Sequence, residues 1–147
     1  MELNKIPTAE ALMFHNIAIN DPSCPLCSSE AESADHLFIA CYIASTVWNG
    51  VSLWCKIPQI FAFSLQYLLN IYSGLDVLEK KKEAVQGIII VSCWSLWRAR
   101  NKLKFLNVPF KIEAILSKIK ALSFLWFSKR SKYKGIVWKD WYSFVNM

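Results

Sequence analysis

Apolar residues recur at helical spacing over most of the chain and predict a mainly α-helical fold. The prolines in residues 56–58 and 107–109 interrupt this pattern, because proline lacks a backbone N–H and clashes with the preceding helical turn. In the first predicted helix, Leu12, Phe14 and Ile17 are expected to face inward. The predicted helices cover about residues 8–17, 35–54, 61–72, 77–106 and 112–128, and a last short turn follows Asp140, with Trp141 and Phe144 as C-terminal anchors.

The predicted helix over residues 77–106 is the longest element. Asp76 and Glu79 have the spacing of a capping box at its start. Its middle, residues 85–97, is apolar on nearly all sides. About thirty residues at 1.5 Å each make a rod of roughly 45 Å. We therefore expect one long, buried central helix around which the second half of the chain is built.

The break at residues 56–58 divides the chain into residues 1–55 and a helical part, residues 56–147. The next stretch, residues 57–75, carries no charge, and Gly74 is well placed to end its helix. A membrane-spanning helix needs about 20 predominantly apolar residues, whereas this stretch is short and contains several polar side chains. We interpret it as a core helix, and we expect no membrane contact.

Four possible metal ligands lie in the N-terminal part, in the spacing C-x2-C-x8-H-x4-C: Cys24, Cys27, His36 and Cys41. A C-x-x-C turn lets two sulfurs converge on one ion, and zinc prefers four such thiolate and imidazole ligands in a tetrahedron. On a regular α-helix, side chains five positions apart diverge by roughly 140°. We therefore expect a kink or a helix start near Cys41, and one structural Zn²⁺ held by the four side chains.

Two other interpretations of these cysteines remain open. A C-x-x-C pair can be a redox dithiol, but that function needs a preceding strand and a helix that opens at the first cysteine; here Asp21-Pro22-Ser23 precedes the pair. Buried, inert thiols are also common in protein cores. Cys55 and Cys93, each alone in an apolar stretch, fit that description.

The residues around the cluster resemble the zinc-binding domain of plant LINE-type (non-LTR) reverse transcriptases. The likeness is dense over residues 4–54, from the lead-in at residues 4–8 through Asp35-His-Leu-Phe38 to Trp48, and looser in the helix around residues 94–105. Tyr42 stands where this family usually has proline. The chain also starts after the apolar helix that normally precedes the lead-in, which implies an N-terminally truncated piece of a retroelement.

This resemblance implies an accessory module without catalytic activity of its own. Polymerase and RNase H sites need clustered carboxylates to hold two metal ions, and the eleven acidic residues here are scattered. The sequence shows no glycine loop for phosphate, and His15 is a lone histidine. We expect no small-molecule substrate. No secretory signal is visible, so we expect an intracellular protein of the nucleus or cytoplasm.

Charge is unevenly distributed between the two parts. Residues 1–55 contain one basic and six acidic residues, a net charge of −5, whereas residues 56–147 contain sixteen basic and five acidic residues, a net charge of +11. Phosphate contacts are therefore expected in the second part. The alternative is a protein-contact module that docks on polymerase and RNase H domains. The candidate RNA or DNA contacts are Arg98, Arg100, Lys102, Lys104, Lys129, Arg130, Lys132 and Lys134.

Overall fold

The computed structural model describes residues 5–133 and 135–147, and within these ranges the fold is helical. The β-structure found in the described residues is an isolated antiparallel bridge between Ser23 and Ala31. The helices are α1 (Ala9–Phe14), α2 (Tyr42–Cys55), α3 (Leu65–Asn70), α4 (Glu79–Leu106), α5 (Ile112–Arg130) and α6 (Trp138–Ser143), with a π-helical turn η2 (His36–Ala40) and a 3-10 turn η3 (Ile71–Gly74). The prediction of a mainly α-helical fold is confirmed.

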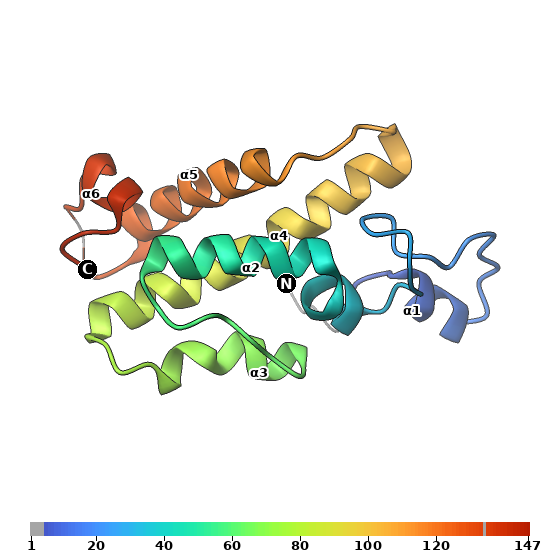
Figure 1. The fold of residues 1–147 in the computed structure, drawn as a ribbon, viewed down its shortest axis with the longest axis horizontal. Helices are drawn as coiled ribbons and strands as arrows, with labels where there is room; N and C mark the ends of the chain where they lie inside the picture. The colour runs from blue at the N-terminus through green and yellow to red at the C-terminus, as the bar shows by residue number, and fades with distance from the viewer. Residues whose placement is uncertain (1–4, 134) are drawn as a thin grey trace.

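Helix α4 is the central rod of the molecule. Its 28 residues correspond to about 42 Å at 1.5 Å per residue. Figure 1 shows α5 running beside α4, while α2 and α3 lie along its other sides. A Cβ atom at Gly87 would lie 2.0 Å from Cζ3 of Trp126. The absence of a side chain at Gly87 therefore lets the α5 indole ring reach the α4 backbone.

Buried apolar side chains form one hydrophobic cluster that extends from Ile6 to Phe144. Helix α2 contacts both α4 and α5, so this core is continuous across the chain break at residues 56–58. Trp141 is fully buried, and its indole N–H donates to the Lys120 carbonyl at 3.0 Å. Phe144 is buried beside it. These two residues anchor the C-terminus, as predicted, but α6 begins at Trp138, so Asp140 lies inside the helix and does not precede it.

The prediction for the first helix is wrong at its end. Thr8 caps the start of α1, its Oγ1 accepting from the Ala11 N–H at 3.3 Å. The helix stops at Phe14, and Asn16 adopts a left-handed conformation with φ 61°. Phe14, the last residue of α1, is 83% exposed, and Ile17, beyond the end of the helix, is 49% exposed, so neither side chain faces inward.

The start of α4 also differs from the prediction. The helix begins at Glu79 with Leu78 as its N-cap, so the capping box from Asp76 does not form. Gly74 is the last residue of η3, so the helical stretch ends there as predicted, but without the left-handed conformation typical of a glycine cap. The reason is tertiary: Leu75 packs on the hydrophobic core, and residues 75–78 turn the chain from η3 into α4.

Residues 57–64 form no helix, with bends at Pro58, Phe63 and Ser64, and α3 begins only at Leu65. Exposure alternates along this segment, as it does where successive side chains point to opposite faces. Ile60 and Ala62 are buried, whereas Phe61 and Phe63 are exposed. The helical spacing of the apolar residues predicted a helix from residue 61, but the structure contains no helix over residues 61–64. Among the described residues, the helices lack the length and apolar character needed to cross a membrane.

Leu96→Asp is expected to unfold the helical core. Leu96 is fully buried in α4, and an unpaired carboxylate there costs on the order of 4–5 kcal/mol or more. Urea unfolding followed by circular dichroism measures the loss. Ile90→Asp in the same helix is the control, because Ile90 is 46% exposed and the substitution should cost much less. Equal losses would contradict the burial of this side of α4.

Candidate metal centre

Cys24 and Cys27 are presented by a tight turn between two short extended segments. The segments pair through the Cys24 N–H donating to the Glu30 carbonyl at 2.7 Å and the Glu32 N–H donating to the Pro22 carbonyl at 2.8 Å. Inside the turn, the Ser28 N–H donates to the Cys24 carbonyl at 2.8 Å, and Ser28 adopts φ 57°. This backbone pairing holds both sulfurs on one side of the turn.

His36 and Cys41 come from a second segment, and its geometry resolves their spacing. His36 begins the π-helical turn η2, and Cys41 is the N-cap of α2. The Cys41 N–H donates to the His36 carbonyl at 2.7 Å. A hydrogen bond over five residues makes a wider turn than an α-helix, so two side chains five positions apart can point the same way. The predicted helix start near Cys41 is confirmed.

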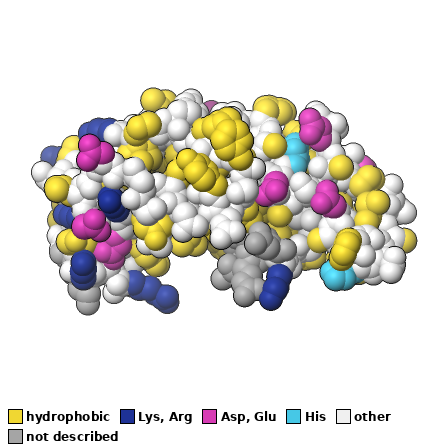
Figure 2. Space-filling model, turned by 90° about the horizontal axis from the view of Figure 1, so that it is seen from below, with side chains coloured by type: hydrophobic (Ala, Val, Ile, Leu, Met, Phe, Trp, Pro, Cys, Tyr) yellow, Lys and Arg dark blue, Asp and Glu magenta, His cyan; other side chains and the backbone are white. Residues whose placement is uncertain are grey.

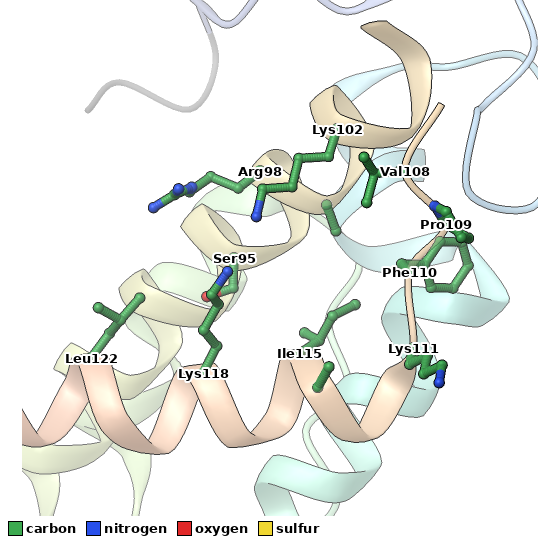
Figure 3. Close-up of a pocket in the computed structure, with 12 residues that line it drawn as sticks. Ser95, Arg98, Lys102, Val108, Pro109, Phe110, Lys111, Ile115, Lys118 and Leu122 are labelled. Carbon is green, nitrogen blue, oxygen red and sulfur yellow. The ribbon is translucent and has the colours of Figure 1, made fainter. Parts of the chain in front are cut away.

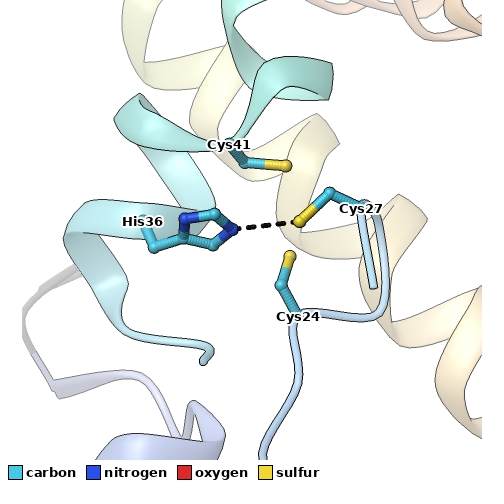
Figure 4. Close-up of side chains that lie close together, drawn as sticks. All are labelled: Cys24, Cys27, His36 and Cys41. Carbon is cyan, nitrogen blue, oxygen red and sulfur yellow. Dashed lines mark hydrogen bonds between the residues drawn. The ribbon is translucent and has the colours of Figure 1, made fainter. Parts of the chain in front are cut away.

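The four side chains converge on one point (Figure 4). Their ligand atoms all lie within 4.8 Å of one another, and Cys27 Sγ is 3.2 Å from His36 Nε2. Three sulfurs and one imidazole nitrogen at this separation suit Zn²⁺, which takes Zn–S bonds of about 2.3 Å and Zn–N bonds of about 2.0 Å. The residues present therefore fit one zinc ion, and four protein ligands would complete its tetrahedral shell.

The pKa values of the two buried thiols, Cys24 and Cys41, are shifted in opposite directions. The hydrogen bond between Cys24 and Cys41 lowers the pKa of Cys41, and the Ala44 and Ile43 N–H groups at the start of α2 lower it further. The same hydrogen bond, together with burial, raises the pKa of Cys24. Zinc binding has to displace the proton that Cys24 holds in the metal-free chain.

His36 presents its Nε2 to the sulfurs and its Nδ1 to the opposite side. Nδ1 is buried without a hydrogen bond, and Glu30 Oε2 lies 3.7 Å away. Ligating histidines usually donate their second N–H to a carboxylate or carbonyl, which fixes the ring orientation. Glu30 is the residue closest to that role here. The Ser33 Oγ accepts from the His36 N–H at 3.0 Å and fixes the start of the turn.

The remaining cysteines are isolated from this cluster. Cys55 and Cys93 are fully buried, and burial raises the pKa of both thiols, that of Cys93 to about 12. They stay protonated and unreactive at neutral pH, as predicted. The redox interpretation of Cys24 and Cys27 is also disfavoured, because the described residues before Cys24 form a turn and one bridge, not a strand leading into a helix.

Arg100 is not a nucleic-acid contact, in contrast to the prediction. Arg100 is 1% exposed, and its Nε donates to Glu32 Oε2 at 2.7 Å, while Nη2 pairs with Glu32 Oε1. Glu32 Oε1 also accepts from the Ala9 N–H at 2.8 Å. A buried and bidentately paired guanidinium cannot reach a phosphate. Arg100 instead ties the zinc-binding turn and α1 to the central helix.

The other predicted basic residues form two groups. Arg98, Lys102 and Lys104 lie near the C-terminal end of α4, and Lys129, Arg130 and Lys132 lie at or just after the end of α5. We call them the α4 group and the α5 group. Lys134 lies outside the described residues. Two cations absent from the prediction, Lys111 and Lys118 at the start of α5, line the same cavity as Arg98 and Lys102.

Comparison with protein families agrees with the geometry. Residues 1–48 match the family model described as zinc-binding in reverse transcriptase. No curated protein and no solved structure matches the chain. The matched range contains all four candidate ligands, and no catalytic domain is detected. Residues 1–48 are therefore a zinc-binding module of the kind found in reverse transcriptases.

Proposed function

We propose that this chain is a non-catalytic accessory module that binds single-stranded RNA or DNA through the exposed basic side chains of α4 and α5. In this proposal the zinc ion has a structural role and stabilises the N-terminal part. The observation that carries the proposal is the set of cations that form no close ion pair. Among the described residues, no carboxylate forms an ion pair with any member of the α4 or α5 group.

Charge and position support this assignment. The N-terminal part carries a net −5 and would repel phosphate, whereas residues 56–147 carry a net +11. The two basic groups are separated along α5, whose 19 residues span roughly 28 Å. A strand bound to both groups would run along α5.

Charge neutralisation tests the proposal. Arg98→Gln/Lys102→Gln/Lys104→Gln and Lys129→Gln/Arg130→Gln/Lys132→Gln are each expected to weaken binding to a single-stranded oligonucleotide. If all three contacts in a group are made, the slope of log affinity against log salt should fall by about 2, since each single-strand phosphate contact contributes about 0.7. Fluorescence anisotropy at several salt concentrations measures both quantities.

The control has the same change in net charge at other sites. Lys56→Gln/Lys82→Gln/Lys139→Gln removes three positive charges outside both groups and should leave the slope nearly unchanged. If this control lowers the slope as much as the two test variants do, binding depends on net charge alone and the proposed surface is wrong.

A second candidate function is docking on the polymerase and RNase H domains of the same element. One observation favours it: Phe61 and Phe63 are 66% and 82% exposed and form an edge-to-face pair at 5.1 Å. Seen from below, the molecule carries exposed hydrophobic side chains over its middle (Figure 2). Phe61→Ser/Phe63→Ser should then abolish co-purification with those domains and leave oligonucleotide binding intact.

We also propose that the chain derives from a plant LINE-type element. The support is the lead-in at residues 4–8 and the Trp-Ser-Leu-Trp-Arg segment at residues 94–98, both of which resemble that family. Sequencing of the locus and its transcripts should show a polymerase reading frame upstream of this chain. A locus without any such remnant would contradict the origin.

A further inference from the structure

A cavity of about 250 Å³ lies between the C-terminal part of α4 and the N-terminal part of α5 (Figure 3). Val108, Phe110, Ile115 and Leu122 make much of its wall apolar. Pockets for drug-sized ligands measure about 300–1,000 Å³. The size of this α4–α5 pocket therefore suits a single ring system with one apolar face.

The charged residues around the pocket are all basic: Arg98, Lys102, Lys111 and Lys118. Lys102 and Lys118 reach toward each other from the two helices (Figure 3). The nearby ammonium group of Lys102 lowers the pKa of Lys118. Within the described residues, no carboxylate forms an ion pair with these four side chains. An anion bound between the two ammonium groups would relieve their repulsion.

Ser95 adds a polar group to the pocket wall. Its side-chain Oγ is buried without a hydrogen-bond partner, although the residue lines the cavity. The comparable serine one turn earlier, Ser92, donates to the Ile88 carbonyl at 2.6 Å. A buried hydroxyl without a partner costs free energy. A ligand with a polar edge could provide that partner, whereas a purely aliphatic chain could not.

We propose that the α4–α5 pocket takes one unstacked base of a single-stranded nucleic acid. The base lies against the apolar wall, its polar edge hydrogen-bonds to Ser95 Oγ, and the adjacent phosphates contact Arg98, Lys102 and Lys118. A nucleotide combines the three features that the pocket complements: a flat apolar face, a polar edge and a neighbouring negative charge. This inference rests on the proposed function and adds where, and through which chemistry, the strand is held.

Binding of two hexanucleotides by the full chain tests the inference. One is hexathymidylate, and the other has the same phosphates but abasic sugars. Base stacking in protein sites corresponds to roughly 5- to 100-fold in affinity, so the parent should bind hexathymidylate at least about fivefold more tightly. Equal affinities would overturn the base pocket and leave the proposed phosphate contacts standing. Absence of binding to either oligonucleotide would overturn both proposals.

Two variants locate the contact. Ser95→Ala should weaken hexathymidylate binding by roughly 3- to 10-fold, leave the abasic affinity unchanged and not lower the melting temperature, because it removes an unsatisfied hydroxyl. Lys118→Gln should weaken both oligonucleotides equally and reduce the salt slope by about 0.7. Ser92→Ala, the control, should change neither affinity. If Ser95→Ala leaves the hexathymidylate affinity unchanged, the pocket does not bind a base. If hexaglutamate at equal concentration displaces the oligonucleotide, the pocket likewise binds another kind of anionic ligand.

Discussion

His36→Ala is expected to abolish stoichiometric zinc binding and to unfold the N-terminal part of the chain. Structural zinc sites contribute on the order of 10–16 kcal/mol of apparent binding free energy in small modules, and binding is coupled to folding. Cys24, Leu37, Phe38 and Cys41 are fully buried members of the common core. Loss of the ion should therefore also lower the melting temperature of the whole chain.

Metal analysis and thermal unfolding measure these effects. The parent should contain one zinc per chain, and a chelator should reproduce the His36→Ala phenotype. His15→Ala is a matched control, because His15 is the other histidine, is exposed and lies outside the cluster. Zinc affinity should fall as the pH is lowered, since protons compete for the thiolates and the imidazole. Full zinc content in His36→Ala would contradict the ligand set.

Glu32→Gln is expected to destabilise the chain by about 3–5 kcal/mol, because it leaves the guanidinium of Arg100 buried without a counter-charge. The side chains of Glu32 and Arg100 are 0% and 2% exposed. This pair connects the zinc-binding turn to α4, so its loss should loosen the attachment of the N-terminal part. Chemical denaturation gives the change in the free energy of unfolding.

Two comparison variants show whether the loss of stability comes from the buried ion pair or from the change in charge alone. Glu79→Gln breaks an exposed pair with Lys82, in which the Glu79 side chain is 79% exposed, and should cost less than about 1 kcal/mol. Glu32→Leu/Arg100→Leu removes both buried charges and should cost less than the two single substitutions together. If the loss of stability in the double variant equals the sum of the losses in the two single variants, the two side chains do not stabilise each other.

Local sequence determined the parts of this protein that depend on neighbouring residues. The four metal ligands lie within eighteen residues, and the spacing of a C-x-x-C turn is itself the geometry that brings two sulfurs to one ion. The long helix around residues 85–97 was equally predictable, because an unbroken apolar stretch without proline or a central breaker favours one buried helix. The start of α2 at Cys41 followed from the five-residue spacing of His36 and Cys41.

Tertiary structure decided which charged side chains are buried in ion pairs and which side of each short element faces the core. Glu32 and Arg100 are 68 positions apart, and no local pattern distinguishes this buried arginine from Arg98, which is exposed. Lys118 meets Lys102 only because α5 folds back along α4. Periodicity reports which side of a segment is apolar, but pairing across the core depends on how helices pack. The positions of the metal ligands can therefore be predicted from local sequence, whereas the fold determines which basic side chains remain outside ion pairs.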